Sequence, residues 1–401
     1  DTAFANKGPV HINAPFEEPL YETVSQLEVQ SYISSIKDDK VKIGDLTPFA
    51  DIWNQSSKKM ILVGVNDPHA IDDATIDFLA NDESVTVWTE TTSNLHHPSF
   101  ITNIDTIITP FTTEDFESFQ PEILITFGGM VVSKRIKAFL RKYKPKHHWH
   151  IDSHRAYDTF GALSQHFEVE SQVFFNQFFP LIKGVESDYS KRLAAIQSIR
   201  KSKHEAYLAS IPFSDFTVFE SIIPRLPNNS QLQIGNSSAI RYAQLIPIDP
   251  SIEVYCNRGT SGIDGCTSTA IGAAVANNKP TILITGDIGF LYDTNALWND
   301  YIPKNFKIIL INNGGGGIFR ILPGHQETPV FNTFFETSHC HTAEHLARMY
   351  GFKYTIASDV ITLDKALNEL YANNKQPQLL EVFTPTRKND SILLNYFKNL
   401  T

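Results

Sequence analysis

Two oxygen-bearing side chains in residues 286–319 could together bind a divalent cation. Asp287 follows the apolar run TILIT, and Asn313 follows the apolar run KIILI at the start of a loop with four glycines. Parallel strands joined by a helix end at the same edge of a sheet, so the two side chains can face each other there. A carboxylate, an amide oxygen and a loop carbonyl suit Mg²⁺, which keeps positions for water and phosphate. A helix after Asp287 would point its amide groups at a diphosphate. The alternative is a strand-end aspartate beside a flexible loop.

The same stretch resembles the metal and diphosphate motif of thiamin diphosphate enzymes. It departs from that motif at one position, because Ile288 stands where the motif has glycine, and Gly289 follows it. One family of these enzymes is similar over nearly the whole chain, through the segments GPVHINAPFEEPLY, NRGTSGIDGCTSTAIG, GDIGFLYDTNAL and NNGGGGIFRILP. This family is the 2-succinyl-5-enolpyruvyl-6-hydroxy-3-cyclohexene-1-carboxylate (SEPHCHC) synthases of menaquinone biosynthesis. The resemblance implies thiamin diphosphate and Mg²⁺ (or Mn²⁺) as cofactors.

The resemblance also assigns residues to the cofactor. The positions that match the family's metal ligands are Asp287, Asn313 and, through its carbonyl, Gly315. The other cofactor-binding positions lie at strand ends and helix starts, and they are Ser237, Ser238, Ile263, Gly286, Ile288 and Gly289. Ile263 would support the cofactor in its bent form, and the two serines would donate to the diphosphate. Hydroxyl side chains at a helix start can instead act as caps, which is the alternative for the serines.

Several residues are candidates for binding the substrates. Arg241 and Arg258 are predicted at neighbouring strand ends, where two guanidinium groups could clamp a dicarboxylate. By resemblance, both bind substrate carboxylates, Lys134 contacts the second substrate, and Ile318 and Phe319 line the pocket for its ring. Surface ion pairs for the arginines and a solvated helix charge for Lys134 are the alternatives.

The reaction implied by the resemblance joins two dianions. It comprises decarboxylation of 2-oxoglutarate and conjugate addition of the remaining four-carbon unit to isochorismate. One alternative is another carboligase or decarboxylase of the same cofactor class, such as an acetolactate synthase, which would not need paired arginines. A second alternative is a non-catalytic nucleotide-binding module, for which the glycine pair in FGGMVVSKR is the signal. The histidines in KHHWHID and HCHTAEH could suggest zinc sites. We instead expect them on a strand and on the surface of a helix, because the nearby sequence lacks the further ligands that zinc needs.

Composition limits the class of protein. The chain has 401 residues, a formal net charge of −10 and 42% hydrophobic residues. The negative charge argues against nucleic acid or an anionic membrane as partner. No apolar run is long enough to cross a bilayer, and three scattered cysteines predict a reducing cytoplasm.

Strands that alternate with helices predict an α/β protein with two doubly wound parallel-sheet domains. We expect a central Rossmann-like domain in residues 21–185 and a thiamin diphosphate-binding domain in residues 186–401. Residues 1–20 read as a strand remnant (VHIN) and a linker. A further strand is expected around ITNIDTIIT, and PGHQETPVFNTFFETSHC is expected to form a mobile lid.

The resemblance further implies that the family's N-terminal, pyrimidine-binding domain precedes this chain. That domain carries the glutamate that activates the cofactor, so the fragment alone is expected to show little turnover. In the family the site lies between two subunits, and we therefore expect a homodimer or homotetramer.

Overall fold

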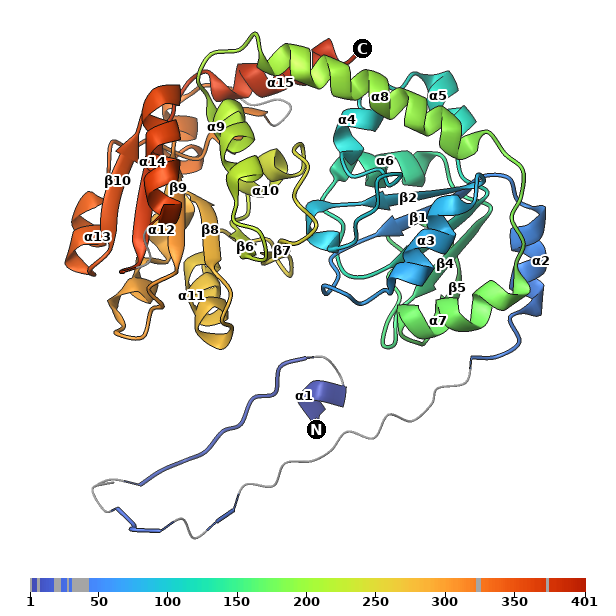
Figure 1. The fold of residues 1–401 in the computed structure, drawn as a ribbon, viewed down its shortest axis with the longest axis horizontal. Helices are drawn as coiled ribbons and strands as arrows, with labels where there is room; N and C mark the ends of the chain where they lie inside the picture. The colour runs from blue at the N-terminus through green and yellow to red at the C-terminus, as the bar shows by residue number, and fades with distance from the viewer. Residues whose placement is uncertain are drawn as a thin grey trace.

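The computed structural model describes residues 2–5, 8–17, 23–26, 29–30, 43–321, 326–372 and 375–401. Its strands form two sheets with parallel pairing, which belong to the two domains at the right and left of Figure 1. The prediction of two doubly wound parallel-sheet domains is therefore confirmed. The expected boundary near residue 21 and residues 323–325 of the expected lid lie outside the described residues.

Five short runs form the sheet of the central domain, in the order β2-β1-β3-β4-β5. These are β1 (Lys59–Val63), β2 (Val85–Thr89), β3 (Ile123–Phe127), β4 (His147–Ile151) and β5 (Leu163–Phe167). Every residue of β1, β2 and β3 is buried, as expected for strands that helices cover on both faces. One face packs against α2 (Thr47–Gln55), α3 (Asp73–Asn81) and α7 (Ser171–Phe178). The other packs against α4 (Ile104–Ile108), α5 (Thr113–Phe119) and α6 (Lys134–Lys142).

The C-terminal domain has six parallel strands in the order β10-β11-β9-β8-β6-β7. They are β6 (Gln231–Ile234), β7 (Glu253–Cys256), β8 (Thr281–Gly286), β9 (Lys307–Asn312), β10 (Lys353–Ala357) and β11 (Gln378–Phe383). One face is covered by α9 (Asp215–Ile222), α10 (Ser238–Ala243), α14 (Val360–Ala372) and α15 (Asn389–Asn399). The other is covered by α11 (Cys266–Ala276), α12 (Asp287–Tyr292) and α13 (Glu344–Met349).

The strand order of the C-terminal sheet reverses between β6 and β8. From β6 the chain continues to β7 on one side, whereas β8 and the later strands lie on the other side. At such a reversal the connections leave on opposite faces of the sheet and open a crevice at the carboxyl ends of the strands. The fold therefore provides a binding position beside the residues that follow β6 and β8.

Contacts between the domains involve the long helix α8 (Tyr189–Leu208), which runs across both in Figure 1. Tyr396 of α15 shares its hydroxyl with His204 Nδ1 of α8 (2.8 Å) and Thr106 Oγ1 of the central domain (3.1 Å). At a second contact, the Asn94 side chain bonds the backbone N–H and C=O of Val254 in edge strand β7, at 2.8 and 2.9 Å. Asn94 thus makes the two bonds that a neighbouring strand would make.

Two local expectations were wrong. The stretch around ITNIDTIIT forms helix α4 instead of a strand, because Ile104, Ile107 and Ile108 recur at helical spacing and are buried together. The VHIN segment, residues 10–13, is not a strand, since it has no pairing partner among the described residues. The sequence analysis also missed β5. Among the residues that the structure describes, none of the helices combines the length and apolar character that a bilayer crossing requires.

The glycine pair of FGGMVVSKR lies where two strand-end turns of the central domain meet. Gly128 has a φ of +76°, a conformation that favours glycine. A Cβ atom on Gly64, after β1, would lie only 1.9 Å from the carbonyl oxygen of Gly129. The close approach of the two backbones therefore explains why glycines occupy these positions, without a bound nucleotide.

Candidate functional site

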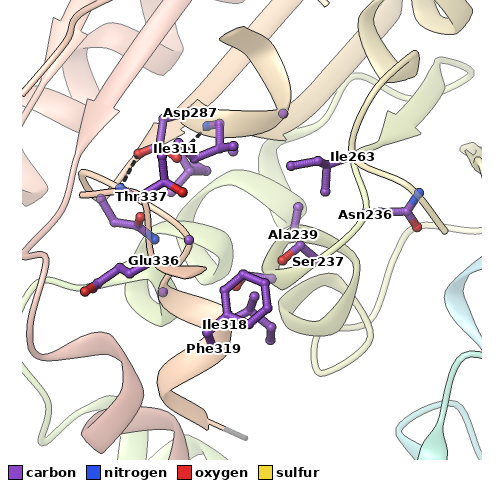
Figure 2. Close-up of a pocket in the computed structure, with 18 of the residues that line it drawn as sticks. Asn236, Ser237, Ala239, Ile263, Asp287, Ile311, Ile318, Phe319, Glu336 and Thr337 are labelled. Atoms are coloured by element: carbon purple, nitrogen blue, oxygen red, sulfur yellow. Dashed lines mark hydrogen bonds between the residues drawn. The ribbon is translucent and has the colours of Figure 1, made fainter. Parts of the chain in front are cut away.

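A cavity of about 320 Å³ opens at the carboxyl edge of β6, β8 and β9, beside the strand-order reversal. Its walls come from the turns that follow these strands and from residues 334–337. Figure 2 shows Ser237, Ile263, Asp287, Ile318 and Phe319 around this space. Residues that are far apart in the sequence therefore meet at one position.

Asp287 joins the ends of β8 and β9. Its Oδ2 atom accepts hydrogen bonds from the backbone N–H groups of Gly314 (2.9 Å) and Gly315 (3.0 Å), directly after Asn313. The same oxygen lies 3.3 Å from His339 Nε2, and the carboxylate raises the pKa of His339. Gly315 has a φ of +148°, and a Cβ there would lie 2.7 Å from the carbonyl oxygen of Glu336. The structure therefore brings Asp287 and the glycine loop together, as the sequence predicted.

Asn313 lines the same cavity and is held by a buried acid. Its Nδ2 atom donates to Asp215 Oδ2 at 2.9 Å. Burial raises the pKa of Asp215 to about 6, although hydrogen bonds from Thr384 and Asn313 act in the opposite direction. The sequence analysis did not single out Asp215.

The serines at the start of α10 also line the cavity. Ser237 has φ 71° and ψ −124°, a conformation that is unfavourable for a residue with a side chain. Ser237 is the N-cap residue of α10, and its side chain makes no capping hydrogen bond. The capping interpretation therefore has no support at Ser237, and its hydroxyl is available to a ligand.

The remaining wall is apolar. Ile263, Ile288, Ile318 and Phe319 line the cavity, while Gly286 and Gly289 contribute backbone. A Cβ atom on Gly289 would lie 3.3 Å from the carbonyl oxygen of Ile263, so glycine allows the Ile263 loop to pack closely. An apolar wall opposite polar strand ends suits a ligand with a ring and an anionic group.

The predicted substrate cations lie beside the cavity instead of on its wall. Arg241 donates to the carbonyl oxygen of Ser237 (2.6 Å), and Arg258 donates to Asn236 Oδ1 (2.7 Å). Loss of hydration, and then the charge of Arg258, lowers the pKa of Arg241. Lys134 is exposed at the first position of α6. Burial lowers the pKa of Lys137, one turn later, and Arg258 and Lys134 add to this effect.

Comparison with known proteins identifies the family. Residues 38–234 match the model described as the middle domain of thiamine pyrophosphate, and residues 234–382 match the C-terminal TPP binding domain of thiamine pyrophosphate enzymes. The SEPHCHC synthase of Flavobacterium johnsoniae is 63% identical over all of this chain and 73% of its own length. The chain belongs to the SEPHCHC synthase family. The synthase of Flavobacterium psychrophilum is 64% identical over all of this chain and 72% of its own length. The synthase of Bacteroides fragilis is 35% identical over 98% of this chain and 71% of its own length. The chain is thus an enzyme sequence of the thiamin diphosphate class, thiamin diphosphate being thiamine pyrophosphate.

The cavity's donor set fits the metal that the family's motif implies. Across the described residues, no group of three or more His, Cys, Asp or Glu side chains could hold a metal ion. A magnesium site at this position would need no such group, because the Asp287 carboxylate, the Asn313 amide oxygen and the Gly315 carbonyl would be its protein ligands, and a bound diphosphate and water could supply the others. All three residues line the cavity. The residues present therefore fit magnesium with a diphosphate.

Replacing Ser237 by glycine is expected to separate stability from cofactor binding. Relief of the φ 71° strain should raise the free energy of unfolding by about 1 kcal/mol, after the added backbone entropy of glycine is subtracted. Loss of one hydroxyl donor should weaken thiamin diphosphate binding about 5-fold. Urea unfolding and calorimetric titration would measure the two effects. Asn229→Gly, at another positive φ (55°) in a different loop, is the control and should leave binding unchanged. A Ser237→Gly variant with unaltered cofactor affinity would contradict this role.

Sequence reasoning missed four residues beside the site. Asp215 and His339 contact predicted site residues, Glu336 lines the cavity, and Arg320 pairs with Glu336. Arg320 Nε donates to Glu336 Oε1 at 2.6 Å, and both side chains are buried. The pair holds the π-helix η6 (Phe331–Phe335) and the segment after it against the glycine loop. The sequence shows Arg320 and Glu336 on either side of an aromatic stretch, and it gives no sign that the two side chains pair.

Proposed function

We propose that the full-length protein carrying this chain is a SEPHCHC synthase of menaquinone biosynthesis. It would use thiamin diphosphate and Mg²⁺ to decarboxylate 2-oxoglutarate and to add the four-carbon unit to isochorismate. The observation that carries the proposal is the convergence of Asp287 and the residues around Asn313 on one cavity. The names of the relatives support the same activity.

In this proposal the strand ends of the C-terminal domain hold the cofactor. Asp287, Asn313 and the carbonyl of Gly315 bind the metal, and Ser237 and Ser238 donate to the diphosphate. Ile263 supports the cofactor from the side opposite the polar strand ends. When bound, the cofactor supplies an electron sink for the decarboxylation. The protein's own contribution is position and charge.

The cations between the domains would bind the substrate carboxylates. Arg241 and Arg258 come from the C-terminal domain, and Lys134 comes from the central domain. Within the described chain, Arg258 Nε is buried and has no hydrogen-bond partner, so its N–H can still donate to an anion. Ile318 and Phe319 would exclude water around the ring of the second substrate. Paired arginines favour a dicarboxylate over pyruvate.

Replacing Arg258 by methionine in the full-length protein tests the substrate. We expect kcat/KM for 2-oxoglutarate to fall about 100-fold, since one charge-assisted hydrogen bond to a carboxylate is worth about 1.5–3 kcal/mol. Affinity for thiamin diphosphate should change less than about 3-fold, because Arg258 bonds Asn236 and does not line the cavity. Kinetics with product detection and calorimetry would measure both.

Arg348→Met is the matched control, because Arg348 is an exposed arginine of α13 paired with Glu344. It should leave both quantities unchanged. If the unmodified protein converts pyruvate as efficiently as 2-oxoglutarate, the protein is instead a carboligase of the acetolactate synthase type. Failure to bind thiamin diphosphate with Mg²⁺ would refute the proposed function altogether.

A further inference from the structure

Asp215 is a buried carboxylate that the proposed chemistry does not use. It is the first residue of α9 and is 2% exposed. Its Oδ2 atom accepts from Asn313 Nδ2 at 2.9 Å, and its Oδ1 atom accepts from Thr384 Oγ1 at 2.5 Å. Its backbone N–H donates to Asn389 Oδ1 at 2.9 Å. Three segments of the C-terminal domain are therefore tied to this one residue, two of them through its side chain.

The hydrogen bond to Asn313 determines which end of the amide faces the cavity. An asparagine side chain donates only through its nitrogen and accepts only through its oxygen. A carboxylate can only accept, so the nitrogen must face Asp215. The amide oxygen of Asn313 then lies on the side away from Asp215, and oxygen is the atom that Mg²⁺ requires. Rotating the amide would place two acceptors against each other inside the protein, which is costly.

A partner behind a metal ligand can control the affinity of the site. Groups that hydrogen-bond to ligating side chains set their orientation, and removing them typically lowers metal affinity about 10- to 100-fold. Thr384 and Asn389 hold Asp215 in place: Thr384 Oγ1 donates to it, and Asn389 Nδ2 lies 3.4 Å from Thr384 Oγ1. The acceptor is therefore rigid as well as buried.

We propose that Asp215 is a positioning residue that presents the side-chain oxygen of Asn313 to the magnesium ion, an inference that rests on the proposed function. Asp215 itself does not contact the metal. Its role is to hold the amide nitrogen and so keep the oxygen directed at the ion. An acceptor at position 215 is needed for this, and a negative charge is not.

Two substitutions separate the acceptor from the charge. In the full-length protein with saturating thiamin diphosphate, calorimetric titration with MgCl₂ should show about 10- to 100-fold weaker binding for Asp215→Leu. Asp215→Asn keeps an acceptor and should bind Mg²⁺ within about 3-fold of the unmodified protein, on the same scale. Excess Mg²⁺ should restore the kcat of Asp215→Leu, which would not happen if the variant were only misfolded.

Thr384→Val is the matched control, because it removes a partner of Asp215 and leaves the bond to Asn313. It should weaken Mg²⁺ binding much less than Asp215→Leu does, because Asn389 still accepts from the backbone of residue 215 and the acceptor for Asn313 is kept. If circular dichroism shows that Asp215→Leu does not fold, Asp215→Glu replaces it in the test. This variant keeps the charge but moves the acceptor, and it should weaken Mg²⁺ binding as Asp215→Leu is expected to. Two outcomes overturn this inference alone. One is unchanged Mg²⁺ affinity in Asp215→Leu or Asp215→Glu, and the other is Mg²⁺ binding by Asp215→Asn that is weakened as much as theirs. Absence of Mg²⁺-dependent binding in the unmodified protein overturns the proposed function and this inference with it.

Discussion

Replacing Asp287 by alanine is expected to abolish binding of thiamin diphosphate in the presence of Mg²⁺. The carboxylate is the one charged member of the proposed ligand set, and it also accepts from the N–H groups of Gly314 and Gly315. Its loss removes a metal ligand and releases the glycine loop. Because partners behind a ligand already change affinity about 10- to 100-fold, loss of the ligand itself should cost on the order of 100-fold or more. Calorimetry with thiamin diphosphate and MgCl₂ would measure it.

Asp287→Asn provides a closer test of the charge. It preserves the size of the side chain, yet a neutral amide is a poorer ligand for Mg²⁺, and its nitrogen cannot accept from the loop. Asp51→Ala, an exposed carboxylate on α2, is the control and should bind as the unmodified protein does. Mg²⁺-dependent cofactor binding of ordinary strength in Asp287→Asn would show that the metal lies elsewhere.

Replacing Arg320 by methionine should produce the largest loss of stability. Arg320 and Glu336 are 6% and 1% exposed, and two hydrogen bonds join them. Removing one partner leaves a buried carboxylate without its counter-charge, which typically costs about 3–5 kcal/mol. The segment around η6 should then detach from the glycine loop, where the Glu336 carbonyl accepts from Gly316 N–H at 2.5 Å. Urea unfolding and limited proteolysis of residues 326–340 would detect both effects.

The double variant Arg320→Met/Glu336→Leu distinguishes a lost ion pair from lost packing. Without either charge, most of the stability should return, because apolar replacements of a buried pair are often neutral or better. Arg387→Met is the control: it breaks the exposed pair between Arg387 and Glu327 (3.2 Å), which should cost less than about 1 kcal/mol. A single variant Arg320→Met as stable as Arg387→Met would contradict the structural role of the buried pair.

The arrangement of the candidate cofactor site was largely predictable from local sequence. Asp287 and Asn313 each follow a run of buried residues, and these runs are the neighbouring strands β8 and β9. Because a crossover between adjacent parallel strands returns the chain to the same edge, the convergence of the two strand ends could be predicted without coordinates. The fold class followed in the same way, from short apolar runs that alternate with helices. The assignment of individual residues to substrates remains a prediction.

Short segments were less predictable. Residues 104–108 are rich in β-branched residues, which favours a strand, yet they form α4 because the burial of Ile104, Ile107 and Ile108 under the sheet outweighs that preference. Periodicity over five residues cannot distinguish the two structures, and the packing partner decides.

Only the tertiary structure revealed what holds the predicted ligands. Asp215 meets Asn313, Thr384 and Asn389, which are 98, 169 and 174 positions away along the chain. His339 reaches Asp287 from a segment that was predicted only as a lid. Local sequence determined the strands, their edge and the ligand types, because these depend on burial pattern and chain connectivity. The orientation of each ligand depends on hydrogen bonds between distant residues, and such pairs leave no pattern in a single sequence.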